Sequence, residues 1–403
     1  MMVRCGIILV LLLSACGNSP AEPNTYLASF SARLEPGSGT IRASLRINQD
    51  TALLRELNLN MPADHYDEVA ADGELSIKND RVVWSVPADG GQLSWRVLKL
   101  TDRDPADAQL NANWAVLKLE DIFPAARVRS HAGSSSDSTL VLTSPSDWSI
   151  ETAYGPAAGQ TLAVDDERKF SRPKGWLVAG DLGIRREQLG ARRIAIAAPK
   201  GTGLRRMDTL TFVSWVLPEF VQVFPQLPER LLIVGAPSEL WRGGLSGFQS
   251  LYLHEDRPLI SENATSPLLH ELAHVAGLHS AIDGADWIVE GLAEYYSLEI
   301  LRRSGGISAQ RFLRAIEFQR KWSERANGSL TDPSSGANTA AAVVVFHHLD
   351  QELAGVGSSL DTLVKRLLEE PNISVTNLVK ISTDMLGQSS DTLSRSLNLD
   401  PGV

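Results

Sequence analysis

Two segments in the second half of the chain have to form helices that meet at one point. The first holds His270, Glu271 and His274, and the second holds Glu290. Residues four apart lie on the same face of a helix, about 6 Å apart along its axis. The two imidazoles can therefore point at a common atom, with the side chain of Glu271 beside them and a carboxylate arriving from the second helix.

The residues around these segments carry helix start and stop signals. Ser266 followed by Pro267 is typical of a helix start, and Gly277 is typical of a helix end. The two histidines therefore fall in the middle of a short helix, where the directions of both imidazoles are fixed. Asp286 is expected to cap the second helix, which places Glu290 in its first turns.

Two imidazoles and one carboxylate form a ligand set that binds zinc and leaves its fourth position open for water. Zinc lowers the pKa of that water toward ~7, and a neighbouring carboxylate can then take up and later deliver the proton. The sequence therefore predicts Zn²⁺ as the cofactor, with His270, His274 and Glu290 as ligands. Glu271 is the predicted general base of a hydrolytic reaction. The alternative is a chance match on an ordinary amphipathic helix.

At these residues the chain resembles the gluzincin metallopeptidases of the aminopeptidase N, leukotriene hydrolase and glycyl aminopeptidase kind. In that family a His-Glu-x-x-His motif precedes a helix that supplies the third zinc ligand, and here that helix reads Glu290-Gly291-Leu292-Ala293-Glu294-Tyr295. The resemblance implies peptide hydrolysis, with a peptide or protein as the substrate. It also implies that Glu294 accepts a hydrogen bond from a ligand histidine. A solvated helix face is the alternative for Glu294.

A second matching block begins with Gly243, Gly244, Leu245 and Ser246. Relatives carry a glycine-rich loop here that leads into an edge strand. The resemblance implies that these four residues bind the backbone of an extended substrate. Aminopeptidases have a glutamate in this loop that holds the free amino group of the substrate, whereas this chain has Ser246. A hydroxyl group anchors an ammonium group poorly, which argues against strict aminopeptidase specificity.

The chain also departs from the family at the group that stabilises the oxyanion. Family enzymes use a tyrosine on a helix after the third ligand, but no tyrosine follows Tyr296. The equivalent helix offers Asn338, Thr339, His347 and His348. The two histidines lie about two turns beyond the expected place, so a pair on the helix surface is the favoured interpretation. Two alternatives therefore stay open: an inactive zinc-binding scaffold, and a hydrolase of the same fold that acts on a non-peptide bond.

The first residues have the features of an export signal. Arg4 precedes an apolar run from Ile7 to Leu13, which is too short to span a bilayer as a permanent helix. Small residues then precede Cys16, and this pattern resembles the bacterial lipoprotein signal. The resemblance implies lipidation of the Cys16 thiol and a protein anchored to the cell envelope. Because Gly17 stands where an inner-membrane lipoprotein commonly has aspartate, we expect the outer membrane. An ordinary cleaved signal peptide is the alternative.

Composition argues against several classes of protein. The chain has 2 cysteines, Cys5 within the signal and Cys16, so the mature chain has no thiol for a disulfide or a thiolate metal site. The net charge of -10 argues against nucleic acid as a partner and against a broadly cationic membrane-binding face. With 403 residues, 43% of them hydrophobic, there is enough apolar material for two domains.

Hydrophobic periodicity changes along the chain. Apolar residues first alternate with polar ones, as in the segment from Ile41 to Ile47, which is the period of strands. Strands and helices then mix, and residues 208–224 are expected to form a helix that breaks near Pro218. The remainder of the chain has the pattern of helices.

From this pattern we predict an α+β multidomain protein. An all-β sandwich or saddle comes first, a thermolysin-like α+β catalytic domain with the zinc site follows, and a helical C-terminal part completes the catalytic region. The predicted segments are the signal peptide at 1–16, a linker at 17–25, the β domain at 26–170, the catalytic domain at 171–305 and the helical part at 306–403.

Overall fold

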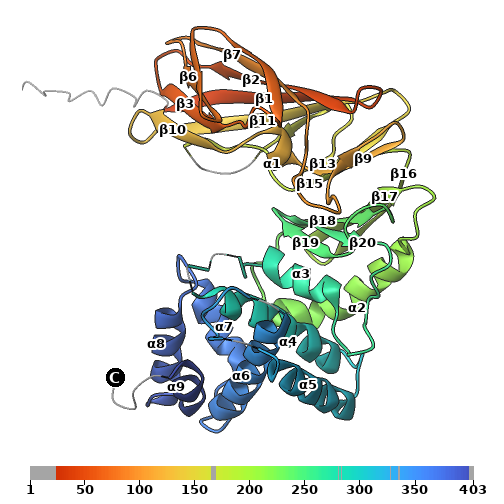
Figure 1. The fold of residues 1–403 in the computed structure, drawn as a ribbon, viewed down its shortest axis with the longest axis vertical. Coiled ribbons are helices and arrows are strands. Elements are labelled where there is room, and N and C mark those ends of the chain that lie inside the picture. Colours follow the sequence, from red (N-terminus) through yellow and green to blue (C-terminus); the bar gives the residue numbers. More distant parts are fainter. Residues whose placement is uncertain are drawn as a thin grey trace, which may run out of the picture.

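The computed structural model describes residues 24–164, 169–279, 281–282, 284–326, 328–334 and 336–398. It is a mixed α+β structure, as predicted, with strands in the N-terminal part and helices toward the C-terminus (Figure 1). The predicted signal peptide and Cys16 lie outside the described residues. Within the described part of the chain, no helix has both the length and the apolar character that crossing a membrane requires.

Three sheets make up the N-terminal part. The first has the strand order β14 (Thr161–Ala163), β11 (Ser135–Thr143), β1 (Thr25–Glu35), β2 (Thr40–Asn48), β7 (Gly90–Val97) and β4 (Tyr66–Ala71). The second has the order β10 (Ala126–Ser130), β3 (Leu54–Asn60), β6 (Arg81–Ser85) and β5 (Glu74–Lys78). The third has the order β13 (Gly155–Pro156), β12 (Ser149–Thr152), β15 (Trp176–Gly180), β9 (Trp114–Lys118) and β8 (Gln109–Leu110), and the short helix α1 (Leu119–Ile122) follows β9. Alternate residues of β2 are buried in a core that all three sheets share, which agrees with the predicted period of two.

The third sheet includes a strand that follows the predicted boundary at residue 170. This strand, β15, pairs with β9 and β12 of the N-terminal part. On its other side, Trp176 and Val178 pack in a small core with Tyr252 of the next sheet. β15 therefore joins the N-terminal part to the sheet that supports the predicted metal site.

The fourth sheet has the order β16 (Leu182–Leu189), β17 (Arg192–Pro199), β18 (Arg230–Ala236), β20 (Ser250–His254) and β19 (Gly244–Gly247). The three central strands are parallel, and the two edge strands are antiparallel to their neighbours. One face packs on the helices α2 (Arg206–Val223) and α3 (Pro267–Val275), and the other faces β15 (Figure 1). β19, which holds most of the glycine-rich block, is thus an edge strand.

Helix α2 runs unbroken through Pro218, so the break predicted there was wrong. Proline inside a helix removes a hydrogen bond and costs about 3 kcal/mol or more. Leu217 and Phe220, on either side of it, are buried in the core beneath the sheet. Burying such a side chain contributes about 1.5–3 kcal/mol. Burial of these two side chains, which precede and follow Pro218 in the sequence, therefore offsets the cost of proline and keeps the segment helical.

The rest of the described chain is helical, as predicted. Its helices are α4 (Asp286–Arg303), α5 (Ala309–Ser323), α6 (Gly336–Ala354), α7 (Leu360–Leu368), α8 (Val375–Leu386) and α9 (Asp391–Leu397). α4 lies at the centre of this group, where it contacts α3, α5 and α6.

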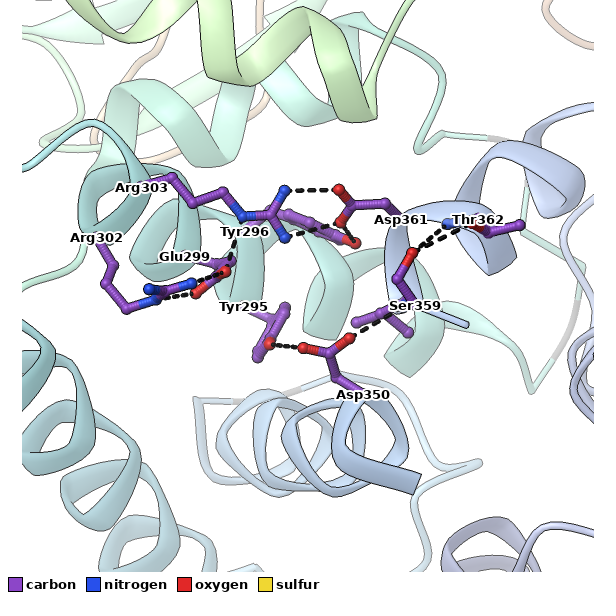
Figure 2. Close-up of polar contacts among 10 residues, drawn as sticks. Tyr295, Tyr296, Glu299, Arg302, Arg303, Asp350, Ser359, Asp361 and Thr362 are labelled. Carbon is purple, nitrogen blue, oxygen red and sulfur yellow. Dashed lines mark hydrogen bonds and ion pairs between the residues drawn. The ribbon is translucent and has the colours of Figure 1, made fainter. Parts of the chain in front are cut away.

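A polar network fixes the second half of α4 (Figure 2). The Tyr296 hydroxyl donates to Asp361 Oδ1 at 2.9 Å, and Arg303 Nη1 lies 2.6 Å from Oδ2 of the same carboxylate on α7. The Tyr295 hydroxyl donates to Asp350 Oδ2 of α6 at 3.0 Å. Burial, together with the charge of Asp361, raises the pKa of Tyr296 well above its usual value, so this hydroxyl keeps its proton. The network joins α4 to α6 and α7 without using a residue of the predicted metal site.

Candidate metal centre

Helix α3, which carries the two histidines, is built as its sequence predicts. Ser266 Oγ accepts a hydrogen bond from the backbone N–H of Leu269 at 3.3 Å, and Pro267 is the first helical residue. The helix ends at Val275, and Gly277 follows with a φ of +127°, a conformation that favours glycine.

The start of α4 differs from the prediction. Asp286 is the first residue of the helix, and Ala285 precedes it as the cap without a side-chain hydrogen bond. Asp286 Oδ2 accepts instead from the backbone N–H of Ser334 at 2.9 Å. The prediction that Asp286 caps α4 was wrong because its side chain turns toward the segment before α6. Its carboxylate still lies in the first turn, where the helix dipole favours negative charge.

Three side chains from α3 and α4 converge at one point. The Nε2 atoms of His270 and His274 are 3.1 Å apart. Glu290 Oε2 lies 3.3 Å from His270 Nε2, and Glu290 Oε1 lies 3.5 Å from His274 Nε2. A tetrahedral zinc site with bonds of about 2.0–2.1 Å separates its ligand atoms by about 3.3 Å. The three groups therefore have the spacing of ligands around one small cation.

The outer hydrogen bonds of the two imidazoles leave their inner nitrogens as acceptors. His270 Nδ1 lies 3.2 Å from Glu294 Oε2, and His274 Nδ1 contacts the carbonyl oxygen of Leu278. These oxygens only accept hydrogen bonds, so each Nδ1 carries the proton. In the neutral imidazoles both Nε2 lone pairs then face each other and the Glu290 carboxylate. A cation between these three electron-rich groups would stabilise them. Two imidazole nitrogens and one carboxylate are a ligand set that fits zinc.

Charges and burial shift the pKa values of all three groups. Burial acts to lower the pKa of His270, but hydrogen bonds to Glu290 and Glu294 outweigh it and raise the pKa to about 10. Burial and the charge of His270 lower the pKa of His274. Burial acts to raise the pKa of Glu290, but the hydrogen bond from His270 outweighs it and lowers the pKa. The carboxylates therefore hold a positive charge at this point.

Glu271 lies against the edge strand β19. The backbone N–H of Ser246 lies near its carboxylate and acts to lower its pKa. Burial raises the pKa of Glu271, and the positive charge of His270 reduces that effect. A Cβ atom at Gly244 would lie 2.7 Å from Cγ of Glu271 and 2.9 Å from its Oε1. Glycine at position 244 is therefore required for the carboxylate to lie where it does.

Gly243 has a related role. A Cβ atom there would lie 1.8 Å from the ring of Trp241. The family resemblance implied that this glycine-rich block binds the backbone of a substrate. In the structure, side chains of the protein itself fill the space that a Cβ atom would take.

A cleft of about 680 Å³ opens beside His274. Ser246 of β19 and His279, which follows α3, line it on the side of the metal centre. Glu120 and Lys174 of the N-terminal part line it from the other side. Sequence reasoning missed both of these residues because they belong to no motif and are far from the histidines along the chain.

The two histidines considered as oxyanion donors lie on α6. The ring of His347 packs against those of Tyr295 and Phe312, at centroid distances of 6.4 and 5.8 Å, and its Nε2 lies 3.2 Å from Nε2 of Gln351. His348 is exposed to solvent. His348 therefore lies on the surface of α6, whereas His347 is partly buried against α4 and α5. Of the other two candidates, Asn338 is buried in the first turn of this helix and Thr339 is partly exposed.

Among the described residues, one other group could hold a metal ion by its spacing: Asp64, His65 and Asp102. It lies at the surface of the N-terminal part, and both aspartates are exposed. Lys99 already forms ion pairs with the two carboxylates. The ammonium group of Lys99 therefore already provides a positive charge between these two carboxylates.

No protein-family model matches the sequence, and no curated protein matches it. Solved structures do match. One is an aminopeptidase N family protein from Idiomarina loihiensis, which is 14% identical, with a TM-score of 0.67 over 94% of this chain and 74% of that chain. Another is yeast LTA4 hydrolase in complex with bestatin, also 14% identical, with a TM-score of 0.58 over 96% of this chain and 71% of that chain.

The chain has the fold of these aminopeptidase N and LTA4 hydrolase structures. This likeness extends over both the β-rich and the helical parts, because it covers nearly the whole chain. It agrees with the predicted α+β multidomain class. At 14% identity it shows the fold, and the chemistry has to be argued from the side chains of the centre.

Proposed function

We propose that this protein is a zinc-dependent peptidase that a lipid on Cys16 anchors to the outer membrane of a bacterial cell envelope. The observation that carries the proposal is the meeting of three acceptors, His270, His274 and Glu290, with a separate carboxylate, Glu271, beside an open sheet edge. The shared fold with an aminopeptidase N family protein and with LTA4 hydrolase supports it.

Each of these groups has a specific role in the proposed hydrolysis. Bound at His270, His274 and Glu290, zinc would polarise the scissile carbonyl group and acidify a water molecule. Glu271 takes the proton from the attacking water and delivers it to the leaving amine. The free edge of β19 orients an extended peptide by hydrogen bonds to its backbone. Glu294 keeps His270 in the orientation and tautomer that present Nε2 to the metal.

The direct test uses the full-length protein, purified in detergent, and a library of peptides. We expect cleavage that a zinc chelator abolishes and added zinc restores. Mass spectrometry of the products identifies the bonds that are cut. Unchanged cleavage after complete removal of the metal would contradict the proposal.

A second candidate function is zinc binding without hydrolysis. It is favoured by the absence of any tyrosine after Tyr296, since the family uses such a residue to stabilise the oxyanion. Zinc-loaded, folded protein that cleaves no peptide in the library would favour this candidate. Cleavage of a non-peptide substrate by the same preparation would favour the remaining alternative, a hydrolase of another bond.

Anchoring makes a separate prediction. Cys16→Ser removes the thiol that would be acylated, so we expect the variant to lose lipid attachment and to stay unprocessed or mislocalised. Metabolic labelling with a fatty-acid probe measures attachment, and Cys5→Ser is the matched control because Cys5 leaves with the signal peptide. Equal labelling of the wild type and the Cys16 variant would refute the anchor.

A further inference from the structure

Trp176 of β15 lies under the edge strand that borders the metal centre. Its side chain is fully buried, and its indole N–H donates to the carbonyl oxygen of Leu245 in β19 at 3.0 Å. Its ring stacks on Tyr252 of β20, with centroids 4.9 Å apart. Lys118 Nζ lies 4.9 Å from the centroid of the Trp176 ring. The indole is therefore held by several groups and contacts both strands of the β19–β20 pair.

The register of β19 decides which of its backbone groups face the metal centre. The backbone N–H of His254 donates to the carbonyl oxygen of Gly243, and Leu245 stands opposite Tyr252. In an antiparallel pair, residues with hydrogen bonds to the partner alternate with residues whose groups point outward. The backbone N–H and C=O groups of Leu245 therefore point toward β20, whereas those of Gly244 and Ser246 point away from β20. The Glu271 side chain packs against this strand at Gly244.

β19 thus lies between Trp176 on one side and Glu271 on the other. Both contacts depend on close approach at a glycine. A Cβ atom at Gly247 would lie 3.1 Å from Cδ1 of Trp176, and one at Gly244 would lie 2.7 Å from Cγ of Glu271. Trp176 is also tied to the turn after β19, since its backbone N–H donates to Ser250 Oγ at 2.8 Å. β19 has one neighbouring strand and otherwise packs on α3, which carries Glu271, so a displacement at Trp176 is passed to the contact between β19 and Glu271.

We propose that Trp176 is a positioning residue for the general base. It holds β19 in the place where Gly244 packs against Glu271 and where the outward backbone groups meet a substrate. The inference rests on the proposed peptidase function. It means that the N-terminal part completes the catalytic site through the strand, although it supplies no metal ligand.

The test compares two tryptophan variants of the full-length protein. Trp176→Phe removes the hydrogen bond to β19. Trp95→Phe removes an equivalent buried bond, from the Trp95 indole to the carbonyl of Ile122 at 3.0 Å, which lies within the N-terminal core. Hydrogen exchange of peptides covering residues 243–250, zinc per chain, kcat and KM are measured for both.

We expect exchange at residues 243–247 to rise roughly fivefold in Trp176→Phe, as the loss of one buried hydrogen bond predicts. We expect kcat to fall by about tenfold or more and KM to rise, with zinc per chain unchanged, because small displacements of a catalytic group cost large factors in rate. Trp95→Phe should change neither exchange at β19 nor the two kinetic constants per zinc-loaded chain. A loss of stability alone would lower the amount of folded protein and leave KM unchanged.

The outcomes separate this inference from the proposed function. Unchanged exchange in Trp176→Phe, or equal effects of both variants on exchange, would overturn the role of Trp176. A wild type without peptidase activity would overturn the proposed function, and the exchange data would still decide whether Trp176 holds β19. Should Trp176→Phe not fold, Gly247→Ala displaces the same contact from the side of the strand and should raise exchange at residues 243–247 in the same way.

Discussion

Replacing Glu271 with glutamine leaves the zinc content near that of the wild type and lowers peptide turnover by at least ~10²-fold. Glutamine keeps the size of the side chain and its packing against Gly244, but it cannot take a proton from water. Zinc stays bound because the ligand atoms belong to His270, His274 and Glu290. Elemental analysis and single-substrate kinetics on the same preparation give the two numbers.

Glu262→Gln is the matched control for this variant. Glu262 is exposed in the segment before α3, and its replacement makes the same change of charge without touching the centre. We expect wild-type turnover from it. If Glu271→Gln cleaved peptides at close to the wild-type rate, the base would be another residue or the activity would belong to a contaminant.

Glu290→Ala removes most of the zinc from the purified protein. The wild type should hold about one zinc per chain with three protein ligands, and the variant keeps only the two imidazoles. It also loses the negative charge that lies 3.3 Å from His270 Nε2 and 3.5 Å from His274 Nε2. Peptide turnover should disappear along with the metal. Elemental analysis after dialysis, followed by titration against a competing chelator, measures the loss.

Glu294→Ala provides a graded comparison on the same helix. Glu294 contacts only the outer nitrogen of His270, so its loss should weaken zinc affinity by the ~10- to 100-fold typical of a residue that orients a ligand. The variant should therefore still load with zinc in excess metal, whereas Glu290→Ala should not. The reverse order of affinities would identify Glu294 as the third ligand in place of Glu290.

Local signals in the sequence predicted the parts of the fold that depend on near neighbours. Ser266 and Pro267 marked the start of α3 because capping is settled within one turn. The alternation through β2 marked a strand because one face of it is buried. The same local reasoning failed at Pro218, where packing on both sides outweighs the cost of proline. It failed again at Asp286, whose partner, Ser334, is distant in the chain.

In the candidate site, too, some residues could be predicted from local sequence and others could not. The spacing of His270, His274 and Glu290 is a property of two helices, and it could be predicted from residue types alone. Glu120 and Lys174 could not be found, because only the folded chain brings the N-terminal sheets to the cleft. The need for glycine at position 244 was also hidden, since it arises from contact with Glu271 across two elements.

The network of Tyr296, Arg303 and Asp361 bears on how such a protein changes over evolutionary time (Figure 2). Helix α4 carries Glu290 near its start, but side chains further along the helix attach it to α6 and α7. Under the proposed function, selection for catalysis and selection for folding act on different residues of one helix. A lineage can lose the chemistry through a single ligand substitution and keep a folded protein with its cleft intact. A reverse substitution at that one position would restore the ligand without rebuilding the fold.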